Sequence, residues 1–413
     1  MKAISIHSPF NKIIERCICA VAFMIPFAKK MVPGLLVLLA LFIILRGVKS
    51  RHFKISKNDV PLILSACIFI LHLVGMLYSE HPENGWAEIG IKSSYILFPI
   101  LAFMSPDFTK TQKEKTMLWF VYGCLAFIPI AIGYGFYRSI TLNDFGYLSY
   151  QDLGIYFHPS YAATYQAFAL FILLQHASLK QFLFNRKWLH YTATFLSVLF
   201  ISMLASKAGL IAAFMSIVAG IFIFIKNKQP KLLSFGIATL LAIFSLSTFK
   251  LLPGAGARLK SAVIDVEAPK TNNNEGGEKS VAYSSTALRL VTWNASWQLI
   301  KSNPLGVGTG DTTPELVKRY KVMGETYAAE KNLNAHNQFL QMGAEHGWPA
   351  MIMIVALLVI AAFRSVQNKQ WVFVLILSLI GMNMLFESFL EVQAGIVFFG
   401  FFLFVGAGRC NNS

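Results

Sequence analysis

Residues 207–226 read KAGLIAAFMSIVAGIFIFIK, an apolar run with a lysine at each end. A helix needs ~20 mostly apolar residues to cross a hydrocarbon core of ~30 Å, and this run has that length. Runs of the same kind, bounded by charged or turn-forming residues, recur along the chain and predict about twelve transmembrane helices. Their predicted centres lie near Ala22, Leu39, Phe69, Leu97, Phe127, Phe168, Leu196, Met215, Leu240, Val355, Leu377 and Phe402.

The composition of the chain points to the same fold. Of its 413 residues, 55% are hydrophobic and 14% are charged, and the mean hydropathy is +0.56. A water-soluble domain does not sustain such values over this length, so the sequence predicts an all-α integral membrane protein. We expect nine spans in residues 1–250, one large and partly helical loop subdomain in residues 251–345, and three further spans in residues 346–413.

Lysine and arginine are distributed unevenly among the connections between spans. They crowd every second connection, which the positive-inside rule places in the cytoplasm together with both termini. The long loop then lies outside the cytoplasm, and its basic residues are nearly balanced by acids. Although the formal net charge is +16, this balance excludes the basic stripe of a nucleic-acid-binding protein. The basic connections are residues 46–57, 110–115, 180–187, 226–231 and 364–369.

The long loop contains a helical pattern and a turn-rich break. Apolar residues recur at spacings of three or four over residues 285–302 and predict a helix in which Arg289 shares a face with Trp293 and Trp297. Residues 303–311 form the break. Their Gly-Val-Gly-Thr-Gly run looks like a phosphate loop, but it lacks the Gly-Lys-Ser/Thr ending and follows no predicted strand, so we expect a tight turn.

His336 lies where the long loop re-enters the membrane, at the boundary between lipid and water. An imidazole can take a proton from an attacking hydroxyl at neutral pH, which is what a transferase requires of its base. The alternative is an interfacial histidine that only caps a helix or hydrogen-bonds a neighbour. The sequence alone leaves both interpretations of His336 open.

Two cations lie on the same predicted side as His336. Arg289 lies in the loop helix, and Lys207 lies at the outer junction of the seventh and eighth spans. Both could hold a diphosphate leaving group, whose negative charge must be met by fixed cations when no metal is present. The alternative is that Lys207 extends to the membrane surface and that Arg289 pairs with a loop carboxylate.

The remaining outer residues predict a metal-free site with an aromatic surface. Acids in the outer loops show no Asp-x-Asp or His-x-x-x-His spacing, so the sequence predicts no metal ligands. The third outer loop carries His158 and Tyr161 among other tyrosines. Such a surface suits sugar stacking, and an aromatic belt at the membrane interface explains it equally well.

Several short motifs occur in a fixed order along the chain. Asn follows His336 directly, and glycine comes after nine further residues, at Gly347. Upstream, Arg289 and the tryptophan four residues later precede an Asn-Pro-Leu-Gly-x-Gly segment. A His-Pro-Ser-Tyr-Ala-Ala segment begins at His158, and a Glu-Ser-x-x-Glu segment begins at Glu387. In this order and spacing the chain resembles the O-antigen ligase and polymerase superfamily, over roughly residues 156–404. Two positions depart from that pattern, Lys207 where the family often has Ser-Arg and Ala350 where a motif often ends in Gly, Thr or Tyr.

The resemblance implies a GT-C-like membrane glycosyltransferase with one large periplasmic loop. Such an enzyme would take a glycan from undecaprenyl diphosphate and pass it to a lipid A-core hydroxyl, at the periplasmic face of a Gram-negative inner membrane. It would need no metal and no cofactor. Besides membrane lipids, its expected partners are this donor and this acceptor. The implied site residues are His336 as the base, Arg289 and Lys207 on the diphosphate, Asn337 orienting the imidazole or a sugar, and His158, Tyr161 and Trp293 in the substrate cavity.

Three other functions compete with the ligase. An O-antigen polymerase would use the same donor but pass the chain to a second lipid-linked repeat. A protein O-oligosaccharyltransferase would pass it to a Ser or Thr hydroxyl. A flippase or transporter would also need many spans, but ion-coupled transporters usually bury carboxylates near the membrane midplane, whereas His72 is the clearest polar residue within a predicted span here.

Overall fold

The computed structural model describes residues 9–27, 30–50, 53, 55–56, 59–148, 151–155, 157–229, 231, 235–239, 270–273, 279–282 and 285–407. Within these residues the fold is predominantly helical. Two short strands, β1 (Lys270–Asn273) and β2 (Lys279–Ala282), pair antiparallel with Lys270 opposite Ala282. The prediction of a helical protein is therefore confirmed.

Long helices account for most of the described chain. In order they are α1 (Pro9–Met24), α2 (Val32–Ser50), α3 (Val60–Gly75), α4 (Pro82–Lys92), α5 (Ser94–Met104), α6 (Lys110–Leu142), α8 (Pro159–Ser178), α9 (Lys187–Met203), α10 (Lys207–Lys226), α13 (Ser285–Ser302), α14 (Thr312–Val322), α16 (Gln338–Gln367), α17 (Trp371–Phe386) and α18 (Gln393–Ala407). The short helices are η2 (Phe145–Leu148), α7 (Gln151–Gly154), η3 (Leu183–Asn185), α15 (Thr326–Glu330) and η4 (Phe389–Glu391).

The predicted span centres can be compared with these helices. Each centre falls within a helix except Leu240, which lies outside the described residues, as do the terminal segments assigned to the cytoplasm and most of residues 251–284. By length and apolar composition, five stretches of the described chain could cross a membrane: α2, the α4–α5 stretch, α6, α10 and α16. Helices α3, α17 and α18 are apolar but shorter. These apolar helices support a membrane protein, while the number of spans stays a prediction.

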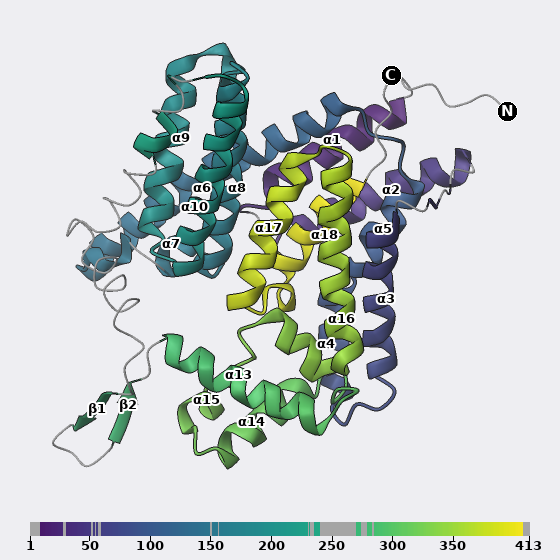
Figure 1. Ribbon diagram of the computed structural model, residues 1–413, viewed down its shortest axis with the longest axis vertical. Coiled ribbons are helices and arrows are strands. Elements are labelled where there is room, and N and C mark those ends of the chain that lie inside the picture. Colours follow the sequence, from purple (N-terminus) through teal and green to yellow (C-terminus); the bar gives the residue numbers. More distant parts are fainter. Residues whose placement is uncertain are drawn as a thin grey trace.

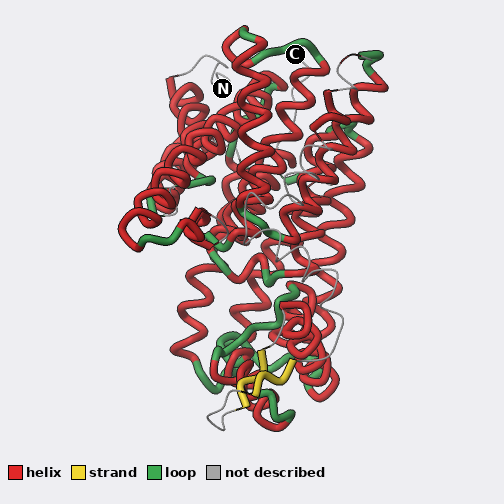
Figure 2. The backbone as a smooth tube through the Cα atoms, turned by 90° about the vertical axis from the view of Figure 1, so that its left-hand side faces the viewer, coloured by secondary structure: helices red, strands yellow, loops and turns green. Residues whose placement is uncertain are grey.

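The helices form a bundle with a smaller layer across one end (Figure 1). Helix α16 packs against α3 and α17, α18 packs against α5, and α10 packs against α8. Helices α13, α14 and α15 lie together at the lower end of the bundle, below α4 and the start of α16 (Figures 1 and 2). They enclose a small core of their own, which includes Leu299, Leu316 and Tyr320. The first turns of α16 therefore lie where the bundle meets this layer.

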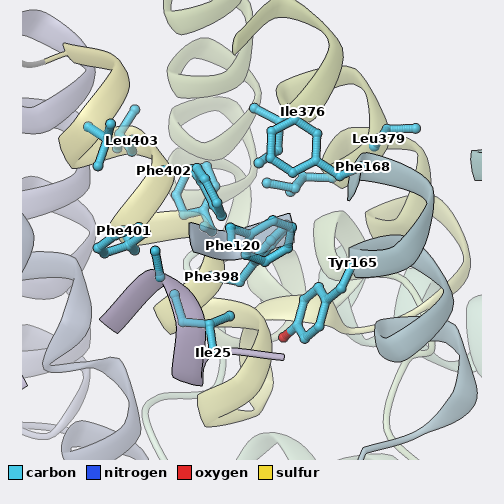
Figure 3. Packing of buried hydrophobic residues seen from close by; sticks show 14 of the residues in the cluster. Ile25, Phe120, Tyr165, Phe168, Ile376, Leu379, Phe398, Phe401, Phe402 and Leu403 are labelled. Atoms are coloured by element: carbon cyan, nitrogen blue, oxygen red, sulfur yellow. The ribbon is translucent and has the colours of Figure 1, made fainter. Parts of the chain in front are cut away.

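The bundle core is rich in phenylalanine (Figure 3). Phe402 on α18 contacts Phe120 on α6 and Phe168 on α8 edge-to-face, at ring-centroid distances of 5.1 and 5.2 Å. Phe398, one turn earlier on α18, lies 5.0 Å from Phe402. Edge-to-face pairs contribute about 0.5–1.5 kcal/mol beyond the area they bury. Helix α18 is buried on all sides through Val405, as expected of an apolar helix at the centre of a bundle.

Helix α16 is interrupted near the boundary between the bundle and the lower layer. His346 has φ −130° and ψ 16°, and Gly347 has φ 71° and ψ −164°, so neither is helical. Gly347 is required here because an added Cβ would lie 2.1 Å from the carbonyl oxygen of Pro304. Residues 304–308 supply the missing backbone partners. The bonds are Val307 N to Ala344 O, Gly308 N to Glu345 O and Trp348 N to Pro304 O, at 3.0, 3.0 and 3.1 Å.

Candidate functional site

The turn between α17 and α18 presents a carboxylate to the lower layer. Glu387 follows α17 directly, and the turn continues through the single-turn helix η4. Tyr161 on α8 supports the turn, since its ring stacks on Phe389 at a centroid distance of 4.7 Å. Its hydroxyl donates to the carbonyl oxygens of Ser388 and Phe389 at 3.5 and 3.4 Å. Tyr161 is only 6% exposed, so this geometry favours a supporting role over the predicted sugar stacking.

Glu387 contacts both residues that the sequence predicted to take part in the transfer reaction, Arg289 and His336. Its Oε1 accepts a hydrogen bond from Arg289 Nη2 at 2.8 Å, and its Oε2 lies 3.3 Å from His336 Nδ1. Arg289 Nε also donates to the carbonyl oxygen of Phe386 at 3.0 Å. One carboxylate thus brings together α13, the segment before α16 and the end of α17. Arg289 does pair with a loop carboxylate, as the alternative interpretation of its sequence position expected. That carboxylate, Glu387, also contacts His336.

The backbone around His336 is fixed from three sides. His336 itself adopts φ 46°, which is uncommon for a residue other than glycine and costs of order 1 kcal/mol or more. Its N–H donates to Asn334 Oδ1 at 3.0 Å, and its carbonyl accepts from Trp293 Nε1 at 3.3 Å. Asn337 caps α16, accepting from two backbone N–H groups, and donates to the carbonyl oxygen of Leu385 at 3.2 Å. Trp293 and Asn337 therefore hold the main chain that carries the imidazole.

The electrostatics of the cluster favour an ionised carboxylate. Burial would raise the pKa of Glu387, but the hydrogen bond with His336 and the charges of His158, Arg289 and His336 outweigh it, so the pKa falls below its ordinary value of 4.5. The Glu387 side chain is 10% exposed, while those of Arg289 and His336 are 21% and 30% exposed. The acid is therefore more shielded from solvent than the cation and the imidazole.

This arrangement can support base catalysis beside a cation. A carboxylate that holds one ring nitrogen of histidine leaves the other to exchange a proton with a substrate. The contact uses Nδ1 of His336, so Nε2 is the atom left for that exchange. Arg289 adds a guanidinium, whose five N–H donors in a planar fork match the oxygen atoms of a phosphate group.

The other predicted residues lie around this cluster. Lys207 Nζ donates to Thr286 Oγ1 at 3.3 Å, and Thr286 precedes Arg289 by one helical turn on α13. The ammonium group thus reaches the same end of α13. His158 caps α8 through its contacts with Ser160 and acts electrostatically on Glu387. All seven residues predicted for the site lie at or next to the same end of the bundle.

Two features of this region were not predicted from the sequence. Glu387 was recognised only as part of a motif, not as the group that joins His336 to Arg289. A second buried pair lies beside it, where Lys92 Nζ contacts Glu391 Oε1 at 2.6 Å and Gln338 Nε2 donates to the same oxygen at 2.8 Å. The lysine within an otherwise apolar stretch was the available signal, because a buried lysine requires an anionic partner.

The donor set at Glu387 does not suit a metal ion. Each oxygen of this carboxylate already contacts a nitrogen of Arg289 or His336, and a guanidinium is not a metal ligand. Among the described residues, one group of histidine and carboxylate ligands does lie close enough together to bind an ion: His72, Glu345 and His346. That group is buried between α3 and α16 and is considered separately below.

Comparison with known proteins agrees with the resemblance predicted from the motifs. Residues 192–355 match the family model described as O-antigen ligase, so the prediction of this family is confirmed over that stretch. The matched stretch contains Lys207, Arg289 and His336, while His158 and Glu387 lie outside it. No curated protein matches the chain. The family match and the apolar helices together indicate a membrane protein with a function of the O-antigen ligase and polymerase type.

Proposed function

We propose that this protein is an O-antigen ligase that transfers a glycan from undecaprenyl diphosphate to a hydroxyl of a lipid A-core oligosaccharide. The reaction would take place at the periplasmic face of a Gram-negative inner membrane. One observation carries the proposal: Glu387 holds His336 and Arg289 at 3.3 and 2.8 Å, so a base and a phosphate-binding cation share one anchor. The family match over residues 192–355 supports the reaction class.

The proposed chemistry begins at His336. Glu387 holds Nδ1, and Nε2 takes the proton of the acceptor hydroxyl as its oxygen attacks the anomeric carbon of the donor sugar. The bond between that carbon and the diphosphate oxygen breaks, and its electron pair leaves with the diphosphate. The proton stays on the imidazole, where the carboxylate stabilises the resulting positive charge.

The leaving diphosphate would be held by the protein's own cations, without a metal. Arg289 offers a planar fork that matches two phosphate oxygens, and Lys207 adds a single positive charge near the same end of α13. Fixed cations of this kind stabilise the charge that develops as the bond breaks. In this proposal Asn337, Trp293 and Tyr161 position the backbone around the site, and His158 lies at its edge.

The decisive experiment is transfer in vitro from a defined lipid-diphosphate glycan to purified lipid A-core, with the full chain in detergent or vesicles. We expect His336→Ala to lower the rate by about 10²- to 10⁴-fold, the usual contribution of a general base. His81→Ala is a matched control, because His81 is a partly exposed histidine paired with Glu83. Unchanged transfer by His336→Ala would remove the proposal for this residue.

The role of Arg289 is tested in the same assay. Arg289→Ala should slow transfer strongly, and Arg289→Lys should recover only part of the rate because lysine lacks the planar fork. Arg138→Ala is the control, since Arg138 is an arginine of similar exposure paired with Asp152. If Arg138→Ala lost as much activity as Arg289→Ala, the loss at Arg289 would reflect general destabilisation and not phosphate binding.

The choice of acceptor separates the ligase from its nearest alternatives. A polymerase would extend a second lipid-linked repeat, and a protein O-oligosaccharyltransferase would modify a Ser or Thr hydroxyl, so both acceptors should be offered beside lipid A-core. The catalytic cluster would serve either reaction unchanged. Movement of the lipid carrier across vesicles without any sugar transfer would favour a flippase.

A further inference from the structure

Three metal-ligating side chains converge inside the protein, away from the Glu387 cluster. His72 on α3 and Glu345 and His346 on α16 are 0%, 0% and 4% exposed. His72 Nε2 lies 3.4 Å from Glu345 Oε1, and His346 Nε2 lies 3.2 Å from the same oxygen. Two imidazoles therefore face one carboxylate oxygen. Because His72 is far from the other two in the chain, no sequence spacing predicted this group.

These side chains lack partners that burial normally requires. His72 Nε2 and both ring nitrogens of His346 are buried without a hydrogen-bond partner, and the carboxyl group of Glu345 has another acid, Glu88, as its side-chain partner. Buried polar groups are nearly always hydrogen-bonded, so three unpartnered ring nitrogens beside one carboxyl group call for a physical explanation. The two histidines and the glutamate face one another, which indicates a shared ligand.

The tautomer of His72 is set by its surroundings. Its Nδ1 lies 2.8 Å from the carbonyl oxygen of Ile68, and because a carbonyl only accepts, Nδ1 carries the proton. In the neutral ring Nε2 then presents a lone pair to the carboxylate of Glu345, an unfavourable contact unless a positive charge lies between them. An imidazole whose other nitrogen donates to a backbone carbonyl is the usual form of a metal-binding histidine.

A single proton does not satisfy the whole group. It could bridge one of the two nitrogen–oxygen contacts at Glu345 Oε1 and would leave the other unsatisfied. A cation between the three side chains would satisfy both contacts. In a tetrahedral site with metal–ligand bonds of ~2.0–2.1 Å, the ligand atoms are roughly 3.3–3.4 Å apart. The two contacts with Glu345, at 3.4 and 3.2 Å, are close to that spacing, and all three ligand atoms lie within 4.8 Å of one another.

We propose that His72, Glu345 and His346 bind a zinc ion that fastens α3 to α16. The charges around the group support a divalent cation, because Glu88 and Glu391 lie within electrostatic range of Glu345, with Lys92 the basic residue among them. Three carboxyl groups therefore lie close together with one lysine among them. Two histidines and one glutamate form a zinc ligand set known from catalytic sites, in which a water molecule fills the fourth position; here all three ligands are buried between α3 and α16, which favours a role in holding the helices together.

The backbone is shaped to form this site. Consecutive residues of a regular helix point about 100° apart, but α16 is interrupted at His346, so Glu345 and His346 can serve one site. Gly75 lets α3 approach the second imidazole closely, since an added Cβ there would lie 2.7 Å from His346 Cε1. Thr309 Oγ1 donates to the carbonyl oxygen of His72 at 2.7 Å, which adds the loop after α13 to the assembly.

The role of the ion would be structural. Glu345 follows His336 by nine residues, and the first turns of α16 lie between them. A zinc ion at this point would hold that part of α16 against α3 and would not contact the proposed reacting atoms. The inference therefore stands independently of the proposed transfer reaction.

The test is the zinc content of the tag-free full chain, purified in detergent and dialysed against Zn²⁺ and then against metal-free buffer. We expect close to one zinc per chain in the wild type and near-complete loss in His72→Asn and in His346→Asn. His190→Asn is the matched control, because His190 is another buried histidine, with its Nε2 bonded to the carbonyl oxygen of Leu173. This control should keep its zinc.

A second measurement guards against loss of zinc through misfolding. Co²⁺ added to the metal-free wild type should give the visible absorption of a tetrahedral site with nitrogen and oxygen ligands, without a sulfur charge-transfer band. Zinc should also raise the melting temperature of the wild type and leave that of His72→Asn unchanged. Absence of retained zinc in the folded wild type, or equal zinc in the wild type and both asparagine variants, would overturn the proposal.

Discussion

Replacement of Glu387 by glutamine tests whether one carboxylate serves both the base and the cation. The substitution keeps the size of the side chain but removes its charge. Two contacts change, the one to His336 at 3.3 Å and the one to Arg289 at 2.8 Å. In the proposed reaction the imidazole becomes positively charged, so the lost interaction matters more in the transition state than in the ground state.

The size of the effect follows from the geometry. At 3.3 Å and an effective dielectric constant of ~20, two unit charges interact by roughly 5 kcal/mol. Partial exposure of His336 reduces this to about 2–3 kcal/mol, which lies within the usual range of about 1.5–3 kcal/mol for a hydrogen bond to a charged group. At ~1.36 kcal/mol for each tenfold change, Glu387→Gln should lower the rate constant of transfer by roughly 30- to 160-fold.

A double-mutant cycle makes the test specific. If Glu387 acts through His336, adding Glu387→Gln to His336→Ala should cost little more than His336→Ala alone. Asp152→Asn is the control, because it also removes a carboxylate paired with an arginine, Arg138. Rates within twofold of the wild type for Glu387→Gln, or fully additive losses in the double variant, would refute the reasoning.

Three further predictions concern stability. Gly347→Ala should lower the free energy of unfolding by about 3 kcal/mol or more, because a φ of 71° suits glycine and an added Cβ would meet a backbone oxygen at 2.1 Å. Thermal unfolding measures this, with Gly90→Ala as the control because an added Cβ at Gly90 meets no other atom within 4 Å. Equal melting temperatures of the two variants would contradict the prediction. Lys92→Met should cost about 3–5 kcal/mol because it leaves Glu391, whose side chain is only 13% exposed, without the ammonium group 2.6 Å away, and a chemical unfolding curve unchanged from the wild type would count against it. Folding lowers the pKa of Glu387 below 4.5, so the stabilisation by its carboxylate is complete above pH 4.5 and is lost as the pH falls through the pKa of the folded state. The difference in melting temperature between the wild type and Glu387→Gln should therefore shrink on acidification. A difference that stays constant with pH would contradict this prediction.

Features set by local sequence were predictable. The helix expected over residues 285–302 has those bounds in the structure, because its apolar spacing and its polar ends are local properties. The expected tight turn is also present, with positive φ angles at Gly306, Gly308 and Gly310. Apolar runs of sufficient length likewise located the helices of the bundle, since the requirement to bury them depends on composition and not on their partners.

The partners of the site residues could not be predicted in this way. Glu387 is 51 positions from His336 and 98 from Arg289, and Lys92 is 299 positions from Glu391. Nothing local distinguishes Glu387 from Glu391, yet one holds an arginine and a histidine and the other holds a lysine. Which acid meets which cation depends on how α4, α13 and α17 pack, and a single sequence does not encode that packing in a local pattern.

The interruption of α16 has a consequence for how the chain can vary. Where the helix lacks its own backbone bonds, residues 304–308 provide them, and each bond depends on the register between that loop and the helix. Insertion or deletion of one residue there would shift the register and leave carbonyl groups of the buried residues Ala344 and Glu345 without partners. The loop supplies backbone bonds that a continuous helix would make itself, so its length is fixed by the helix with which it pairs.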